Sequence, residues 1–212
     1  MKRLLDSGLE ELSTVVFRMG ELAEEAIDES IAGFLEGMDV STRVRSLAEI
    51  IVTMGVDAED KAFELIAKYQ PVASDLRIIK SYMKIAYDLE RFGRYAWDIS
   101  FIHKKLAKSE KCIHFGDLLE KITEKVTAMV RTSIGALKNH DAESARTLAK
   151  TEQEVDDVYF RYLDQLAKAH PATECLTSNL LVVTYLERIS DHAAYLGESV
   201  IYIATGEKVI LR

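Results

Sequence analysis

Two pairs of carboxylates in the C-terminal half of the chain have the spacing and the surroundings for chemistry. Glu187 and Asp191 stand four residues apart, and Glu152 and Asp156 repeat that spacing. Residues four apart lie on one face of a helix. Glu187 and Glu152 also share helical spacing with apolar neighbours, so both are expected to face the interior. A buried carboxylate without a partner costs several kcal/mol, so the sequence indicates a cation or a proton nearby.

A metal ion is one way to satisfy these acids. Helices on either side of a break at Pro171 are expected to be antiparallel neighbours, which would bring the four carboxylates together. Oxygen ligands suit hard cations such as Mg, Mn, Ca or ferric iron. The alternative is pairing with basic side chains such as Arg188 or Lys150. The expected metal ligands are Glu152, Asp156, Glu187 and Asp191.

An internal repeat bears on how many such sites exist. The segment that starts at Ile31 resembles the one that starts at Ser133, and Leu89-Glu90-Arg91 resembles Leu186-Glu187-Arg188. The corresponding residues in the first half are Ile50, Met54, Glu90 and Arg94. Three of the four acids are therefore missing there, and Arg94 is expected to neutralise Glu90. The sequence predicts one metal site, in the second half.

The elements that position these residues are predicted to be helices throughout. Only 2 Pro and 10 Gly are present, and strand-like alternation is hard to find. Apolar periodicity predicts six helices, at about 9–37, 41–69, 72–103, 117–138, 142–169 and 173–205. We therefore expect an all-α fold of two tandem three-helix bundles. The first unit would span residues 1–103, a connector 104–116, and the second unit 117–212.

Composition narrows the class of protein. With 212 residues, 48% of them hydrophobic, the chain can bury a substantial core. A net charge of -8 argues against nucleic acid as a partner. No apolar run has the length of a membrane span or a signal peptide, so a cytoplasmic location is expected. Cys112 and Cys175 stand outside any paired motif and are expected to be free thiols.

Several motifs together resemble the PhoU family of phosphate-uptake regulators. They are Gln70-Pro71-Val72-Ala73-Ser74-Asp75-Leu76-Arg77, Asp88-Leu89-Glu90-Arg91, Glu152 with Val155-Asp156, Leu186-Glu187-Arg188-Ile189-Ser190-Asp191-His192-Ala193, and Tyr202-Ile203-Ala204-Thr205-Gly206-Glu207. The resemblance spans essentially the whole chain. The combination of the first motif with two Leu-Glu-Arg segments is specific to the family.

The resemblance implies a fold, a cofactor and a role. It implies two three-helix bundles with metal clusters, commonly of iron or zinc and in some members of manganese or magnesium. It carries the ligand role to the four acids of the second half, whereas Ile50, Met54 and Arg94 depart from the pattern. For the signature residues Asp75, Arg77, Asp88 and Glu90 it leaves the role open, and for the first three we expect ion pairing between helices.

The role that the resemblance implies is that of a cytoplasmic, non-enzymatic adaptor. Such proteins restrain a phosphate ABC transporter through its ATPase subunit and, in bacteria, a sensor histidine kinase. They reach the membrane only through these partners, and a homodimer is compatible with the role.

Two other functions compete with the adaptor. A ferritin-like di-metal oxidase also uses carboxylates inside a helical bundle, but it needs Glu-x-x-His on two helices. The residues three before the histidines are Ser100, Lys111, Leu137, Ala167 and Ile189, none of them Glu. A metal-free structural adaptor is the second alternative. The chain also lacks a Gly-rich phosphate loop and a Ser/His/Asp signature. We therefore expect a regulator and not an enzyme.

Overall fold

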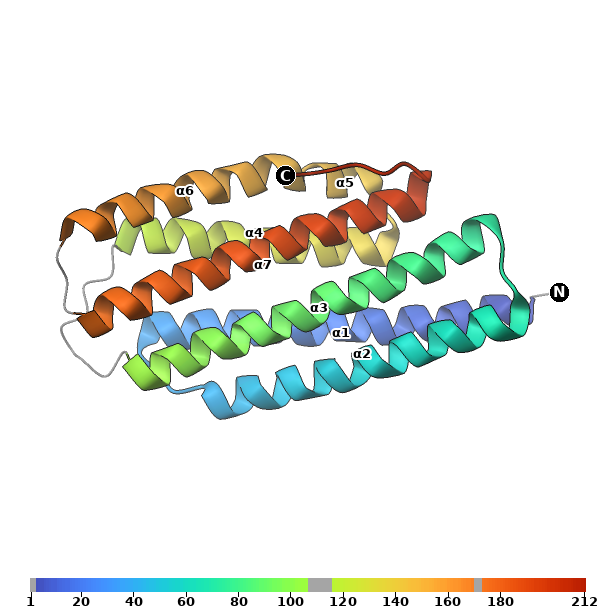
Figure 1. Cartoon of the computed structure of the whole chain (residues 1–212), viewed down its shortest axis with the longest axis horizontal. Helices are drawn as coiled ribbons and strands as arrows, with labels where there is room; N and C mark the ends of the chain where they lie inside the picture. The colour runs from blue at the N-terminus through green and yellow to red at the C-terminus, as the bar shows by residue number, and fades with distance from the viewer. Residues whose placement is uncertain (1–2, 107–115, 170–172) are drawn as a thin grey trace.

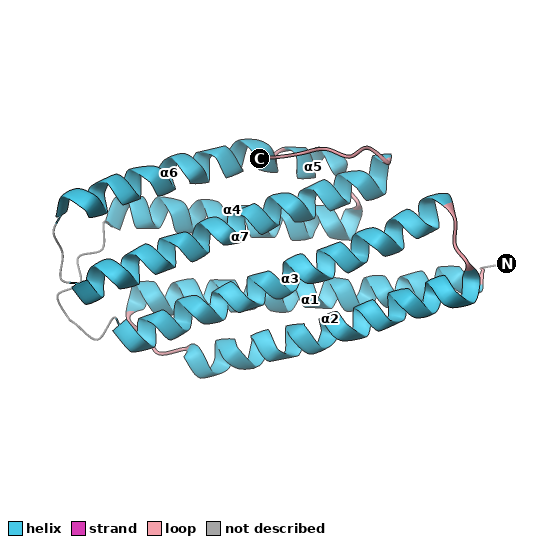
Figure 2. Ribbon diagram, viewed as in Figure 1, coloured by secondary structure: helices cyan, strands magenta, loops and turns pink. Residues whose placement is uncertain are grey.

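The structure, a computed structural model, describes residues 3–106, 116–169 and 173–212. Every regular element in these ranges is an α-helix, as expected, and the helices form an elongated bundle (Figures 1 and 2). They are α1 (Leu4–Glu36), α2 (Ser41–Tyr69), α3 (Ala73–Leu106), α4 (Gly116–Asn139), α5 (Ala142–Arg146), α6 (Leu148–Ala169) and α7 (Thr173–Thr205).

The two halves of the chain meet along α3 and α7. Helices α1, α2 and α3 pack on one another, α4, α6 and α7 do the same, and α3 and α7 run side by side through the middle of the bundle (Figure 1). Helix α1 also touches α4 across this junction. The buried apolar side chains of both halves belong to one cluster, which includes Leu89 of α3 and Leu196 of α7. The halves therefore share a continuous hydrophobic core.

The ends of α1 show how local hydrogen bonds set helix boundaries. The helix starts at Leu4, earlier than predicted, because the backbone N–H of Arg3 donates to the Asp6 carboxylate at 3.0 Å. It ends at Glu36. Gly37 follows in the left-handed conformation with φ +74°, which a glycine adopts without steric cost.

The predicted helix 142–169 is divided in two, and this corrects the expectation. Asp141 caps α5 by accepting hydrogen bonds from the N–H groups of Glu143 and Ser144. At Thr147, between α5 and α6, both the backbone N–H (3.2 Å) and the hydroxyl (2.7 Å) donate to the carbonyl of Ser144. These contacts over three residues compete with the regular helical ladder and interrupt it.

Some expectations fall outside the described residues. These are the break at Pro171 and the state of Cys112. Most of the predicted connector 104–116 also lies there, while its residues 104–106 continue α3. Cys175 is described and is disulfide-bonded, so the expectation of a free thiol is wrong for this residue.

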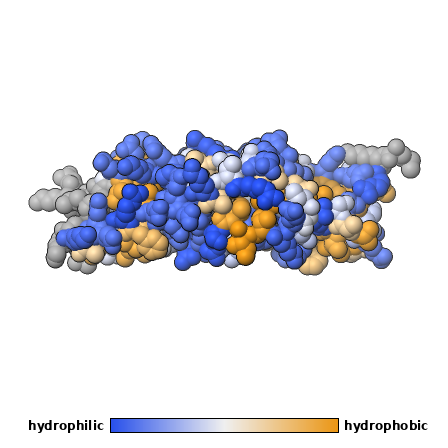
Figure 3. Space-filling model, turned by 90° about the horizontal axis from the view of Figure 1, so that it is seen from above, coloured by the Kyte–Doolittle hydropathy of each residue, from blue (hydrophilic) through white to orange (hydrophobic). Residues whose placement is uncertain are grey.

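Two further features of the molecule are the polarity of one face and the apolar length of its helices. Seen from above Figure 1, the molecule is mostly hydrophilic, with separate hydrophobic areas between the polar side chains (Figure 3). In the described ranges, no helix carries an apolar segment of sufficient length to span a bilayer.

Candidate functional site

The structure brings the four predicted acids together between α6 and α7. Glu152 and Asp156 lie on α6, and Glu187 and Asp191 lie on α7. Glu152 and Asp191 are buried, with 6% and 4% of their surface exposed, whereas Asp156 and Glu187 are half-buried. The four carboxylates, called the acidic cluster below, therefore include two that have largely lost contact with water.

Burial and mutual repulsion change the acidity of this cluster. Burial raises the pKa of Glu152 to about 7, and the nearby negative charges of Asp156, Asp191 and Glu187 add to this effect. Burial and the neighbouring Asp191 also raise the pKa of Asp156 and of Glu187. The cluster therefore attracts positive charge and binds protons more readily than isolated carboxylates do.

Two arginines supply positive charge to the cluster. Arg188 Nη1 lies 3.2 Å from Asp191 Oδ2, and its Nε lies 3.6 Å from Glu187 Oε2. Arg212 Nη1 lies 3.2 Å from Asp191 Oδ1. The Arg212 guanidinium also stands over the ring of Tyr195, 4.5 Å from its centroid. Both oxygens of Asp191 thus already have cationic partners.

Arg212 reaches the cluster because the C-terminal segment, residues 206–212, turns back along α7 (Figure 1). Gly206, with φ +80°, allows the reversal after the helix ends. The backbone N–H of Leu211 donates to Glu198 Oε1 at 3.1 Å, and the Leu211 side chain is buried. Gly197 leaves room for Leu211 and for Leu148 of α6, because a Cβ there would lie 3.2 Å from Leu211 Cδ1 and 2.6 Å from Leu148 Cδ1. Sequence reasoning missed Arg212, since the segment has no periodicity that would place it.

The arrangement does not fit a metal ion while Arg212 is in place. Carboxylate oxygens are the right donors for hard cations. However, Asp191 is occupied by two guanidinium groups, and across the described ranges no three Asp, Glu, His or Cys side chains are placed to hold one metal ion. Metal binding at the acidic cluster would require Arg212 to leave.

Two of the signature residues lie at the start of α3. Asp75 forms an ion pair with Arg3, with 3.0 Å between Oδ2 and Nη1, which fastens α3 to the start of α1. Arg77 Nη2 donates to the carbonyl of Ile203 in α7 at 3.4 Å, and its guanidinium faces the ring of Tyr202 at 5.9 Å. These contacts hold neighbouring helices together at one end of the bundle.

Asp88 lies deeper, in the junction between the halves. It is 2% exposed, burial raises its pKa, and its Oδ1 lies 2.8 Å from His192 Nδ1 on α7. The His192 ring is surrounded by aromatic rings, with Tyr195 at 5.4 Å and Tyr95 at 5.8 Å between centroids. The sequence did not connect these two residues, which lie on helices of different repeats.

Glu90 departs from expectation. Its predicted partner Arg94 pairs with Asp98 instead, with 3.4 Å between Nε and Oδ2, and lies over the ring of Trp97. Glu90 points toward Gly55 of α2, where a Cβ would collide with it. Burial and the charge of Glu59 raise the pKa of Glu90. The i+4 spacing to an arginine was therefore misleading, because Glu90 faces α2 rather than along its own helix.

Comparison with known proteins fits this architecture. The family model described as PhoU domain matches twice, over residues 16–102 and 119–200. The chain belongs to the PhoU family. The first PhoU match contains all four signature residues of α3, and the second contains the acidic cluster. Arg212 and the rest of the C-terminal segment lie beyond both matches.

Relatives and solved structures of the PhoU family resemble the chain over nearly its full length. A "Phosphate-specific transport system accessory protein PhoU homolog" of Clostridium acetobutylicum is 34% identical over 99% of this chain and 98% of its own. One of Caulobacter vibrioides is 31% identical over 95% and 90%. The crystal structure of PhoU from Pseudomonas aeruginosa superimposes with a TM-score of 0.91 at 26% identity, covering 95% of this chain and 99% of that one. PhoU from Streptococcus pneumoniae shares the fold, with a TM-score of 0.88 at 23% identity over 97% and 99% of the two chains.

Proposed function

We propose that this protein is a negative regulator of phosphate uptake, an adaptor that acts on a phosphate ABC transporter. The observation that carries the proposal is the pair of PhoU domain matches, together with relatives that are named accessory proteins of the phosphate-specific transport system. The PhoU homologues support an accessory role in phosphate transport at the general level. The direction of regulation and the partners belong to the proposal.

The proposed partner is the ATPase subunit of the transporter, and a sensor histidine kinase is the second. The protein would act in the cytoplasm, without catalysing a reaction, and would reach the membrane only through these partners. A net charge of -8 favours protein partners over nucleic acid, since a phosphate backbone repels an acidic surface. Self-association as a homodimer is part of the same proposal.

Deleting the gene in its host tests the regulatory role. At high external phosphate, we expect the deletion strain to take up more phosphate and to express phosphate-starvation genes several-fold above the parent strain. A plasmid copy should restore repression, and a strain that also lacks the transporter should show no extra uptake. Unchanged uptake and reporter expression in the deletion strain would refute the negative role. Binding of the purified chain to the purified ATPase subunit tests the partner separately.

We also propose that the acidic cluster accepts a metal ion when Arg212 leaves it. Two features support this: four carboxylates share the site, and burial and repulsion raise the pKa of three of them. Arg212 is held at the cluster by one ion pair and by the Tyr195 ring, with 43% of its side chain exposed. A divalent or trivalent cation would bring more charge than a guanidinium. Iron and zinc are the first candidates, followed by manganese and magnesium.

Elemental mass spectrometry of the untagged, dialysed protein tests the metal site. We expect Arg212→Ala to retain more metal per chain than the wild type, because one oxygen of Asp191 becomes available. The pair Glu187→Gln/Asp191→Asn should retain none. Arg94→Ala is the matched control, since it removes an arginine remote from the cluster, and should behave as the wild type. Equal metal content in all four proteins would show that the cluster is satisfied by arginines alone.

A further inference from the structure

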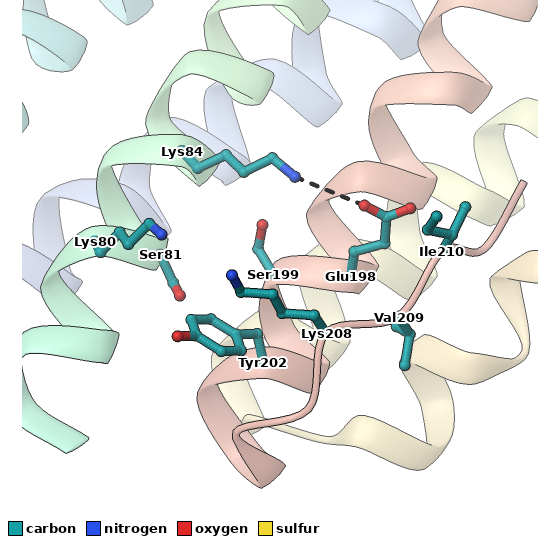
Figure 4. Close-up of a pocket in the computed structure, with 9 residues that line it drawn as sticks. All are labelled: Lys80, Ser81, Lys84, Glu198, Ser199, Tyr202, Lys208, Val209 and Ile210. Carbon is teal, nitrogen blue, oxygen red and sulfur yellow. Dashed lines mark ion pairs between the residues drawn. The ribbon is translucent and has the colours of Figure 1, made fainter. Parts of the chain in front are cut away.

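A cavity of about 460 Å³ lies between α3, α7 and the C-terminal segment. The residues that line it include Lys80, Ser81 and Lys84 of α3, Ser199 and Tyr202 of α7, and Lys208 of the C-terminal segment (Figure 4). Its volume is within the range of small-molecule binding sites. It is separate from the acidic cluster, because none of the four acids lines it.

The cavity is rich in positive charge. Lys84 is paired with Glu198, at 3.7 Å between Nζ and Oε2, and Glu198 in turn accepts the N–H of Leu211. Lys80 and Lys208 have no such partner, because in the described part of the chain no carboxylate lies within ion-pairing distance of either. The protein as a whole has a net charge of -8, but two ammonium groups without a carboxylate partner make the surroundings of this cavity positive.

Hydroxyl groups also line the cavity, and Glu198, Val209 and Ile210 complete the lining. Ser81 and Ser199 are buried, with 3% and 4% exposed, and they form the inner wall between α3 and α7. In Figure 4 the amines of Lys80 and Lys208 extend toward the space that the Ser81 and Ser199 hydroxyls and the Tyr202 phenol also face. Ser199 donates its hydroxyl proton to the carbonyl of Tyr195 at 3.0 Å, whereas a ligand can accept from the ammonium groups.

Arg77 adds a further positive charge near the cavity, next to the ring of Tyr202. It is three residues before Lys80 and seven before Lys84, so the three side chains follow one face of α3. Its guanidinium lies 5.9 Å from the centroid of the Tyr202 ring, and its buried Nε has no hydrogen-bond partner among the described residues. A lysine ammonium acts on an anion as a compact point charge with three donors, and a set of them can surround the oxygens of a tetrahedral anion.

We propose that this cavity binds a phosphate group, held by Lys80 and Lys208 and by the hydroxyls of Ser81 and Tyr202. The group can belong to inorganic phosphate or to a phosphorylated small molecule such as a nucleotide, and both present the same oxygens. The negative charge of the protein as a whole does not oppose this. Repulsion from distant carboxylates is screened over about 8 Å at physiological ionic strength, whereas the lysines act at contact distance. The proposal does not depend on the regulatory role given above.

Calorimetric titration of the full-length protein tests the proposal, with inorganic phosphate and ATP as probes and sulfate as a reference anion. The variant is Lys80→Gln/Lys208→Gln. The matched control is Lys105→Gln/Lys121→Gln, which removes the same charge from exposed lysines away from the cavity. Circular dichroism and thermal unfolding verify that both variants are folded.

We expect the cavity variant to bind the phosphate probe about tenfold more weakly or worse, since each lost lysine removes a charge-assisted hydrogen bond. The control should stay close to the wild type. Binding of ATP but not inorganic phosphate would assign the group to a larger molecule, and the reverse would assign it to the free anion. Equal weakening in both variants, or no binding of either probe to the wild type at millimolar concentration, would overturn the proposal.

Discussion

Polar contacts join the two halves of the bundle beside the apolar core that the halves share. Tyr82 of α3 and His140, which follows α4, are linked by a hydrogen bond of 2.9 Å between Oη and Nε2. Burial lowers the pKa of His140 and raises the pKa of Tyr82 to about 12. Both shifts favour the neutral forms, in which one of the two groups donates the hydrogen bond and the other accepts it, according to the tautomer of His140.

A pH-dependent contribution to stability follows for His140. Below its ordinary pKa of 6.5, the unfolded chain takes up a proton at this residue more readily than the folded chain. The free energy of unfolding should therefore decrease as the pH is lowered through this range. His140→Gln should cost about 1 kcal/mol at pH 8, by loss of the hydrogen bond, and its deficit relative to the wild type should shrink toward pH 5.

Urea unfolding of both proteins at intervals between pH 5 and pH 8 measures this difference. Glutamine retains a strained backbone at this position, where φ is +50°, so the comparison isolates the side chain. Parallel stability curves over the whole range would show that His140 does not titrate differently in the folded protein.

Helices were predictable from the sequence to the extent that their apolar periodicity is strong. The six predicted segments correspond to the helices of the structure, and the two acidic pairs lie on the expected pair, α6 and α7. The break at Thr147 was missed because it comes from hydroxyl and backbone hydrogen bonds that do not disturb the apolar pattern. The apolar periodicity indicates which face of a helix is buried, but it does not indicate where side-chain hydrogen bonds replace the helical ones.

The arginines at the acidic cluster show a second limit of prediction from sequence, which concerns contacts between distant segments. Of its partners, Arg188 is on the same helix as Glu187 and was a candidate from spacing alone. Arg212 comes from an extended segment whose path depends on a helix stop, a buried Leu211 and a glycine in α7. The link between Asp88 and His192 likewise depends on how the two halves pack. Contacts between elements far apart in sequence carry no local signal.

On the scale of the whole molecule, the C-terminal segment touches both candidate sites. Lys208 lines the cavity beside α3, and Arg212, four residues later, is paired with Asp191. Between them, Leu211 anchors the segment to α7 through its buried side chain and its hydrogen bond to Glu198. The two sites therefore share one structural element without sharing a ligand.

This sharing makes the two proposed ligands thermodynamically linked. A cation that displaces Arg212 removes one attachment of the segment that positions Lys208, so metal should weaken phosphate binding. By reciprocity, phosphate must then weaken metal binding by the same factor. The Kd for phosphate with saturating metal divided by the Kd without metal should exceed one, and it should equal the Kd for metal with saturating phosphate divided by the Kd without phosphate. Ratios of one would mean that the C-terminal segment stays in place when the ion pair between Arg212 and Asp191 is broken. Ratios above one would mean that the protein binds metal more tightly when phosphate is scarce.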